Sequence, residues 1–432
     1  RKILHQMKTE PFDLMQYLSM DAHRPLIRAM IRLQGRLDPE VFRRAVDLSA
    51  ATVPQIRCRF SSRTHTWEEC GFTAGEIVHV REAGENAEDE ARRLLLDSID
   101  LCMEPHLKIH LVRGQEADTL CVIFSHMVGD GAALKQYLYL LAALYRRCAR
   151  TSGVIVPPEP RDRGVGQVLR GLGGGGKPFT VLRRIGPDLL VQLRLRAKAG
   201  GATLNEVLIA AYGRAHHALT RSRECTVPCP VDLRKYLPRE ERGGICNLTG
   251  SCFCRFRVGE GEPFEETLRK VSGELSQRKN NRDDLLKGPM LLSLLFTFLP
   301  FRAAKELFHK NFSIPVVSYT NLGVLDRRRL DFGNGKPMDA FLTTAVRRPP
   351  YFQVSASTYG GVCTLSSNLC GPEQDRRTAE RFLDGMVREL RRFAGEPAHK
   401  APAGSKTNAG GDSRAEGQPA GPKSGPEKKS ER

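Results

Sequence analysis

The chain has 432 residues, of which 40% are hydrophobic and 27% are charged, a composition typical of a globular protein with room for two sizeable cores. No apolar run approaches the roughly 20 residues that span a bilayer, and the first residues lack the apolar core of a signal peptide, so we expect a cytoplasmic protein. The net charge of +18 favours anionic partners, among them a nucleotide-bearing thioester, an acidic carrier protein or a membrane surface. Because the sequence has no helix-turn-helix, zinc-finger or RNA-binding aromatic pattern, we do not expect nucleic acid to be a partner.

The 12 cysteines are expected to stay reduced, because the chain is long and has no signal peptide pattern. Cys252 and Cys254 alternate within a strand-like run, and Cys225 and Cys229 flank a proline-containing segment. Neither pair belongs to a repeated Cys-x-x-Cys arrangement, so no metal site is expected.

The first half alternates predicted strands with predicted helices. Asp38 and Pro39 begin a helix, because an aspartate caps free amide groups and a proline suits the first helical position. An acidic helix is predicted over residues 85–96. Runs of apolar and β-branched residues predict strands at residues 26–33, 55–60, 107–112 and 119–124.

A candidate catalytic motif, Ser125-His126-Met127-Val128-Gly129-Asp130-Gly131, follows the last of these strands and precedes a predicted helix over residues 132–145. A histidine held at a strand end suits a general base. Gly129 and Gly131 are expected to let the backbone turn sharply and to leave room for a substrate. A single histidine beside a strand is more often a packed or solvated residue, so the surrounding sequence has to decide between these readings.

The middle of the chain changes character between residues 156 and 180, where prolines and a glycine run predict a linker. The glycine run is not a phosphate loop, because Pro178 stands where a magnesium-binding Ser or Thr is required. We therefore divide the chain into a first half (residues 1–155), the linker (156–180), a second half (181–395) and a disordered tail (396–432).

The second half also mixes the two kinds of element. Thr203 and Glu206 form a capping box at the start of a helix. The apolar run 290–299, which Pro300 ends, is interpreted as a buried or tunnel-lining helix. Further helices are predicted from residue 263 and over 376–393, with strands at 225–231, 248–257, 315–323, 351–358 and 363–369. The predicted fold class is α/β, with each half an α+β two-layer sandwich.

The motif at residues 125–131 resembles the His-x-x-x-Asp signature of a superfamily. Its members are chloramphenicol acetyltransferase, the condensation domains of peptide synthetases, polyketide-associated acyltransferases and plant BAHD acyltransferases. Other segments resemble landmarks of these proteins in the same order, with Asn334 in place of a tryptophan of the BAHD motif. They are residues 33–40, 53–57, 230–234 (Pro-Val-Asp-Leu-Arg), 318–323 (Ser-Tyr-Thr-Asn-Leu-Gly) and 331–335 (Asp-Phe-Gly-Asn-Gly).

The resemblance implies two chloramphenicol-acetyltransferase-like halves arranged in a V, with a channel along their interface. His126 would be the general base that activates a hydroxyl or amine acceptor for attack on an acyl thioester. Asp130 would point away from the substrate and pair with an arginine, for which Arg234 is the candidate, although Arg234 could equally be a surface charge. Ser318 and Asn321 are candidate oxyanion or substrate contacts.

The resemblance also implies the partners. We expect a monomer with no tightly bound cofactor, which uses acyl-CoA or the phosphopantetheine arm of an acyl carrier protein as co-substrate. Ser125 stands where peptide-synthetase condensation domains usually have a first histidine, which favours a free-standing acyltransferase. Two alternatives stay open: a free-standing condensation protein that joins carrier-bound building blocks, and a non-catalytic homologue that binds a thioester or a carrier.

Overall fold

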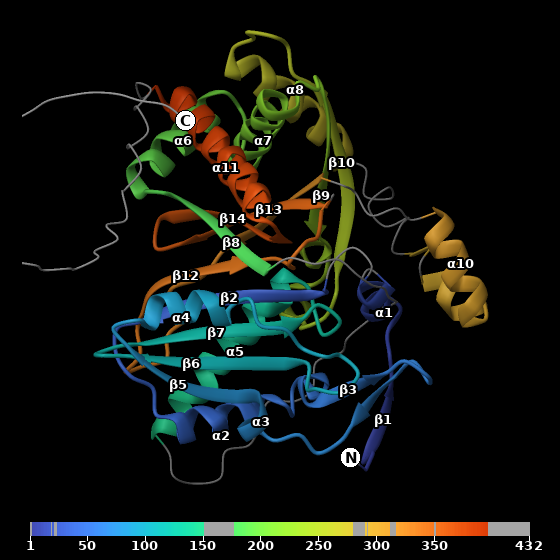
Figure 1. Cartoon of the computed structure of the whole chain (residues 1–432). Coiled ribbons are helices and arrows are strands. Elements are labelled where there is room, and N and C mark those ends of the chain that lie inside the picture. Colours follow the sequence, from blue (N-terminus) through green and yellow to red (C-terminus); the bar gives the residue numbers. More distant parts are fainter. Residues whose placement is uncertain are drawn as a thin grey trace, which may run out of the picture. The chain divides into compact units, whose positions relative to one another are not determined.

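The computed structural model describes residues 2–18, 20, 24–150, 177–279, 290–291, 293–311, 317–349 and 351–395. The tail predicted over residues 396–432 and most of the linker predicted over 156–180 lie outside the described residues. The described residues build a mixed α/β fold with two larger sheets, which confirms the predicted class (Figure 1).

The first large sheet has five strands in the order β12-β2-β7-β6-β5. Its central strand β7 is buried at every residue, as the apolar run over residues 120–124 predicts. Helices α2 and α5 pack against each other and α4 contacts β6 and β7. The bounds are β2 Leu26–Leu33, β5 Val78–Gly84, β6 Leu107–Gly114, β7 Asp118–Ser125, β12 Pro337–Thr343, α2 Pro39–Ser49, α4 Ala87–Leu94 and α5 Gly131–Arg150.

A smaller sheet of three strands, in the order β1-β4-β3, belongs to the first half of the chain. The strand predicted over residues 55–60 is wrong at its start, because Pro54–Arg57 form a 3₁₀ helix and β3 begins only at Cys58. The fixed φ of Pro54 suits that turn. The elements here are β1 His5–Lys8, α1 Pro11–Leu18, β3 Cys58–Ser61, β4 Thr66–Glu69 and α3 Ala74–Ile77.

The second large sheet has four strands in the order β11-β13-β14-β8. Helix α11 packs against β8, β14 and α7, which buries its apolar face in the second core. Helices α7 and α8 also contact each other, and β9 pairs with β10 in a separate two-stranded ribbon. The bounds are β8 Lys177–Ile185, β9 Glu224–Asp232, β10 Thr249–Arg257, β11 Val317–Val324, β13 Phe352–Tyr359, β14 Val362–Gly371, α6 Pro187–Ala199, α7 Leu204–Thr220, α8 Phe264–Lys279, α10 Phe301–Asn311 and α11 Glu373–Ala394.

Two predicted helix starts are confirmed in atomic detail. Asp38 caps α2 by accepting hydrogen bonds from the backbone of Glu40 and Val41. Thr203 and Glu206 form the reciprocal capping box of α7.

Strand β12 was not predicted, and it joins the two halves. It comes from the second half of the chain but pairs with β2 in the first sheet, where Ala340 lies opposite Ile31. The hydroxyl of Ser357 on β13 bonds both the backbone N–H (3.0 Å) and the carbonyl (3.2 Å) of Leu342. Figure 1 shows β12 between β2 and the strands of the second sheet.

The apolar run 290–299 is not a buried helix where the structure describes it. Met290, Leu294 and Phe298 are more than half exposed, and only Leu295 and Phe296 pack against the first core. The prediction of a buried or tunnel-lining segment is therefore wrong for these residues. In the described part of the chain, no helix is long and apolar enough to cross a membrane.

Candidate active site

His126 lies directly after the last residue of β7, so a strand that is buried at every residue fixes its position. Its backbone N–H donates to the carbonyl of Pro25 at 2.7 Å. Its half-buried side chain lines a cavity of about 330 Å³, called here the His126 cavity. Residues from both halves of the chain form its wall, among them Phe12, Met15, Ile27, Pro228, Asn247, Thr249, Ser318, Thr320, Leu322 and Arg347.

Asn247 holds the imidazole of His126 in place. The Nδ2 of Asn247 donates to Oδ1 of Asp13 at 3.0 Å and to the carbonyl of His126 at 2.9 Å. Its Oδ1 therefore faces Nδ1 of His126, 3.2 Å away. Because this oxygen can only accept, Nδ1 carries the hydrogen and Nε2 is left as the basic nitrogen.

The surroundings of His126 favour a neutral imidazole. Burial has the largest effect and lowers the pKa of His126 below its ordinary value of 6.5, and the positive charge of Arg347 lowers it further. The carbonyl of His126 itself, Asp130 and Asn247 act in the opposite direction without reversing the shift. The ring is accordingly uncharged near neutral pH and able to accept a proton.

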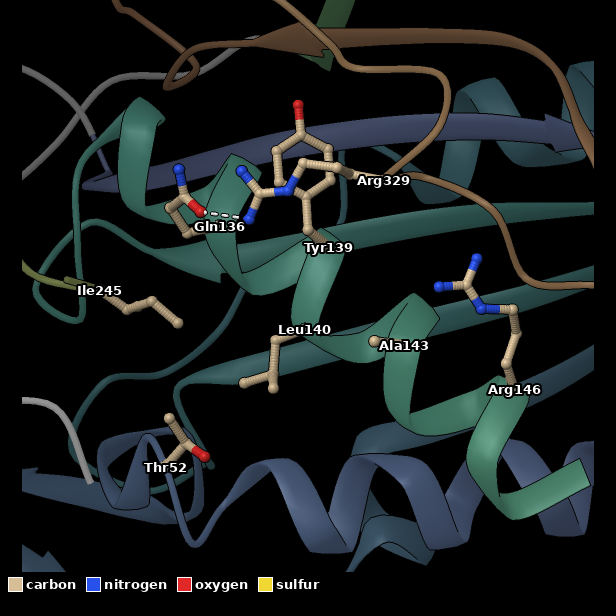
Figure 2. Close-up of a pocket in the computed structure, with 8 residues that line it drawn as sticks. All are labelled: Thr52, Gln136, Tyr139, Leu140, Ala143, Arg146, Ile245 and Arg329. Atoms are coloured by element: carbon tan, nitrogen blue, oxygen red, sulfur yellow. Dashed lines mark hydrogen bonds between the residues drawn. The ribbon is translucent and has the colours of Figure 1, made fainter. Parts of the chain in front are cut away.

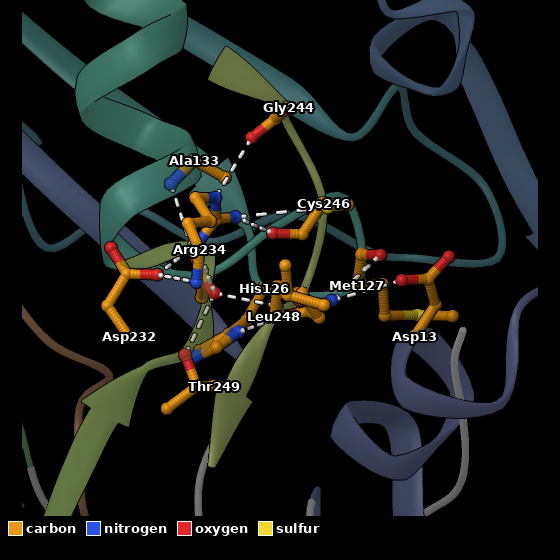
Figure 3. Close-up of polar contacts among 12 residues, drawn as sticks. Asp13, His126, Met127, Ala133, Asp232, Arg234, Gly244, Cys246, Leu248 and Thr249 are labelled. Carbon is orange, nitrogen blue, oxygen red and sulfur yellow. Dashed lines mark hydrogen bonds and ion pairs between the residues drawn. The ribbon is translucent and has the colours of Figure 1, made fainter. Parts of the chain in front are cut away.

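The structure brings Asp130 and Arg234 together as a buried ion pair. The Nη1 of Arg234 lies 3.0 Å from Oδ2 of Asp130, and each side chain is at most 5% exposed, which excludes the reading of Arg234 as a surface charge. The same Oδ2 accepts from the backbone N–H of Leu248 and the hydroxyl of Thr249, both at 2.8 Å, and Oδ1 accepts from the N–H of Ala133 at 2.9 Å. Figure 3 shows Arg234 with its other partners Asp232, Gly244 and Cys246.

This network determines the charge of both groups. Burial alone would raise the pKa of Asp130, but the charge and hydrogen bond of Arg234 hold the pKa below its ordinary value. Burial would likewise lower the pKa of Arg234, and Asp130 raises it instead. Arg234 also donates to the carbonyls of Cys246 (2.5 Å) and Gly244 (3.2 Å). Through these hydrogen bonds and this ion pair, Asp130 connects the turn after His126 to the segment that carries Asn247.

The two glycines of the motif serve close packing and not a left-handed turn, since neither has a positive φ. A Cβ on Gly129 would lie 2.4 Å from the Cβ of Ala133, and one on Gly131 would lie 2.3 Å from a methyl group of Leu322. The backbone turns at residues 126–128 without a positive φ at either glycine, and Gly131 lines the His126 cavity.

The two candidate oxyanion contacts lie in different surroundings. Ser318 lines the His126 cavity. Asn321 is exposed and is not among the lining residues; its Nδ2 donates to Asn205 at 3.0 Å and its Oδ1 accepts from the N–H of Gly323 at 2.8 Å. The geometry therefore favours Ser318 and assigns Asn321 to the turn of its own strand.

Sequence reasoning missed Asp13, Asn247 and Arg347. Arg347 lines the same cavity, and its guanidinium donates to Oε1 of Gln353 at 2.9 and 3.1 Å. Burial, only partly offset by Tyr351, lowers its pKa to about 10. The only sequence signal for Asn247 is its place just before a predicted strand. Among the described residues, no group of three or more His, Cys, Asp or Glu could hold a metal ion.

A second hollow, of about 250 Å³, lies along α5 and is separate from this site because His126 does not line it (Figure 2). The guanidinium of Arg329 stacks over the ring of Tyr139, 4.3 Å from its centroid, and donates to Oε1 of Gln136 at 2.9 Å. The hydroxyl of Tyr139 accepts from the N–H of Asp326 at 2.7 Å. These contacts fasten the segment after β11 to α5.

The sequence matches no known family profile. It is 23% identical over 305 residues to the nonribosomal peptide synthetase TES of Alternaria alternata, which covers 60% of this chain and 6% of that protein. It is 22% identical over 314 residues to the cyclosporin synthetase simA of Tolypocladium inflatum, which covers 62% of this chain and 2% of that protein. The matched part of the chain thus spans a small fraction of these relatives.

Solved structures with this architecture include the trichothecene 15-O-acetyltransferase TRI3 of Fusarium sporotrichioides, with a TM-score of 0.67 and 14% identity over 91% of this chain and 95% of that one. Polyketide synthase associated protein 5 of Mycobacterium tuberculosis has a TM-score of 0.63 and 16% identity, over 92% of this chain and 99% of that one. The first condensation domain of the calcium-dependent antibiotic synthetase also has a TM-score of 0.63 and 16% identity, over 92% of this chain and 98% of that one. The chain therefore has the fold of condensation domains and chloramphenicol-acetyltransferase-like acyltransferases, and the predicted resemblance is confirmed at the level of the fold.

Proposed function

We propose that the protein is an acyltransferase that moves an acyl group from a thioester, acyl-CoA or an acyl carrier protein, to a hydroxyl or amine. The observation that carries this proposal is the state of His126. Asn247 binds its Nδ1, while Nε2 has no hydrogen-bond partner within the described residues and the ring lines a cavity walled by both halves of the chain. An imidazole in this state is suited to accept a proton from a nucleophile.

The proposed reaction needs one base and no covalent enzyme intermediate. Nε2 of His126 takes the proton of the acceptor hydroxyl or amine as the acceptor oxygen or nitrogen bonds to the thioester carbon. The tetrahedral intermediate then breaks its carbon–sulfur bond, and the imidazolium returns the proton to the leaving thiolate. The ester or amide and the free thiol leave the site, and His126 is neutral again.

The developing oxyanion requires donors near His126. The hydroxyl of Ser318 and the guanidinium of Arg347 both line the cavity. The cation of Arg347 would stabilise the negative charge of the intermediate more strongly than a neutral hydroxyl. We therefore assign this role to Arg347, with Ser318 as a weaker contributor.

A free-standing condensation protein is the second candidate, because condensation domains have the same fold and the matched relatives are peptide synthetases. Both candidates share the chemistry at His126 and differ in whether the acceptor is itself bound to a carrier. Ser125 in place of a first histidine favours the simple acyltransferase.

The test is a mass-spectrometric screen of acyl-CoA and carrier-bound donors against pooled alcohols and amines, with wild type and His126→Ala. We expect a product that forms with the wild type and falls by at least about a hundredfold with the variant. His216→Ala is the matched control, because His216 is a half-buried histidine outside the cavity. Equal turnover by His126→Ala would remove His126 from the mechanism. Donor binding without turnover in the wild type would indicate the non-catalytic homologue.

A further inference from the structure

The helix before Pro300 exposes a group of large apolar side chains. Residues 290, 291 and 293–298 are helical, and Leu294 and Phe298, one helical turn apart, share a face of this helix. Phe298 is 74% exposed, more than any other large hydrophobic residue that the structure describes. The exposed members of the group, called here the apolar segment, are Met290, Leu291, Leu294, Phe298 and Leu299. Exposed apolar side chains that occur together in this way mark an interaction surface.

Another face of the same helix is anchored to the protein. Leu295 and Phe296 pack against the first core. The ring of Phe296 lies 6.4 Å from that of Phe301, and Phe301 stacks on His65 with 3.7 Å between the ring centroids. The helix is thus held by one face while the face with Leu294 and Phe298 remains in solvent.

The chemistry of the apolar segment favours a lipid partner over a protein partner. Residues 290–301 include no charged side chain, and only Ser293 and Thr297 carry a polar group. A protein interface fixes its partner through hydrogen bonds and charged groups around an apolar centre. The boundary between headgroups and acyl chains of a bilayer requires only apolar side chains, above all Leu, Phe and Trp.

Basic side chains follow the apolar segment directly. Arg302 comes four positions after Phe298, so at most about 15 Å separate their Cα atoms. Lys305 and Lys310 belong to the same helix as Arg302, α10, in which Glu306 is the only acidic residue. Arg302 and Lys310 are exposed and Lys305 is half-buried. This end of the chain segment therefore has a net positive charge.

A fourth cation comes from the first half of the chain. Arg63 lies in the exposed turn between β3 and β4, two positions before His65, whose ring stacks on Phe301. The four cations, called here the basic rim, are Arg63, Arg302, Lys305 and Lys310. None of them forms a side-chain hydrogen bond or an ion pair with another described residue. Their charge is therefore available to an anionic partner.

We propose that the apolar segment inserts into the surface of an anionic lipid bilayer, with the basic rim on the lipid phosphates. The stems of Arg and Lys side chains lie along apolar surface while their charges stay in water. They are thereby placed at the level of the headgroups when neighbouring Leu and Phe side chains enter the acyl boundary. This attachment goes beyond the acyl transfer proposed above and does not depend on it.

The test is co-sedimentation of the full chain with lipid vesicles. We expect the wild type to bind vesicles of phosphatidylcholine with about 30 mol% phosphatidylserine at least about tenfold more tightly than vesicles of phosphatidylcholine alone, because each basic residue near an anionic surface contributes. Leu294→Gln/Phe298→Gln should weaken binding to the anionic vesicles at least about tenfold, because two exposed side chains lose their apolar contact with lipid. A higher salt concentration should weaken it as well.

The matched control is Val191→Gln/Leu195→Gln in α6. These residues are also one helical turn apart and are 52% and 63% exposed, and this variant should bind the vesicles like the wild type. Arg302→Gln/Lys305→Gln should lose most of the preference for anionic vesicles and keep its binding to phosphatidylcholine alone. Thermal unfolding checks that each variant is folded.

The outcomes distinguish the possible partners. No binding to either kind of vesicle, or binding that Leu294→Gln/Phe298→Gln retains, would overturn the proposal. Equal binding to neutral and anionic vesicles would overturn the role of the basic rim. A wild-type dimer that does not bind vesicles and that Leu294→Gln/Phe298→Gln dissociates would show that a second copy covers the apolar segment, and would overturn the lipid partner. All these results are read from binding, so they stand whether or not acyl transfer at His126 is observed.

Discussion

The side-chain oxygen of Asn247 lies 3.2 Å from Nδ1 of His126, although 121 positions separate the two residues in the chain. The amide nitrogen of Asn247 is bound in turn by Asp13, 234 positions away. Three segments that are distant in sequence thus fix one tautomer of one imidazole. If Nε2 is the catalytic base, Asn247 is a positioning residue and not a reacting one.

Replacing Asn247 with Ala should lower kcat about tenfold to a hundredfold and leave KM nearly unchanged, because the tautomer and orientation of His126 are lost while the cavity remains. Steady-state kinetics and the nitrogen NMR signals of the imidazole would measure both effects. Asn334→Ala is the control, since Asn334 is exposed and its side chain donates to the carbonyl of Arg36 at 3.3 Å. An unchanged tautomer in Asn247→Ala would contradict this assignment.

The pH dependence of kcat/KM should follow the shifted pKa of His126. In the proposed mechanism the neutral imidazole is the active form, so activity should be lost as the pH falls through this pKa, which burial lowers below 6.5. The charge of Arg347 disfavours the imidazolium, so Arg347→Gln should move the acid limb to higher pH as well as lowering the maximum rate. Arg63→Gln should leave the profile in place. An acid limb that stays at the same pH in Arg347→Gln would show that the two groups do not interact.

Local signals in the sequence predicted the elements whose ends are determined by neighbouring residues. Asp38 and Thr203 cap helices through backbone groups two or three positions away, and β7 contains a continuous apolar run over residues 120–124. Strand β12 was missed because its partner is β2, some 300 positions earlier, and its sequence begins with Pro337.

The residues of the candidate site likewise fall into two groups: those that a motif or the resemblance indicated, and those that only the folded chain brings together. His126 and Asp130 were found because they lie four positions apart in one motif, and Arg234 was found through the resemblance. The partners of His126 were missed, because only the folded chain brings Asp13 and Asn247 to it. Asn321 was chosen by its place in a turn, and its side chain in fact bonds within that turn and to Asn205.

Replacing Asp130 with Ala should lower the free energy of unfolding by about 3–5 kcal/mol, because it leaves Arg234 buried without its carboxylate. Urea unfolding would measure this loss, and activity should fall with it. Since the pKa of Asp130 is lowered in the folded protein, the wild type should lose this stabilisation as the pH falls below the unfolded value near 4. That part of the pH dependence should be absent from the variant.

The matched control for Asp130→Ala is Glu260→Ala. Glu260 pairs with Arg223, but the two side chains are 80% and 48% exposed, so the change in the free energy of unfolding should be at most about 1 kcal/mol. If Asp130→Ala abolished activity with unchanged stability, the carboxylate would act in the reaction and not in holding the turn.

Adding a methyl group at Gly129 should destabilise the protein more than adding one at Gly131. At Gly129 the new Cβ would lie 2.4 Å from the Cβ of Ala133. The backbone determines the position of both Cβ atoms, so the start of α5 must shift, at a cost of about 1–3 kcal/mol. At Gly131 the new Cβ would lie 2.3 Å from the end of the Leu322 side chain, and this side chain can rotate away.

The effect of Gly131→Ala should therefore appear in the reaction. Leu322 and Gly131 both line the His126 cavity, so a displaced Leu322 narrows it, and we expect KM to rise for bulky substrates while the melting temperature changes little. Gly273→Ala in α8 is the control, because nothing lies within 4 Å of the added methyl and alanine favours a helix by up to about 1 kcal/mol. Equal losses of stability at Gly129 and Gly131, with unchanged KM, would mean that Leu322 cannot move and that the two glycines serve the same packing role.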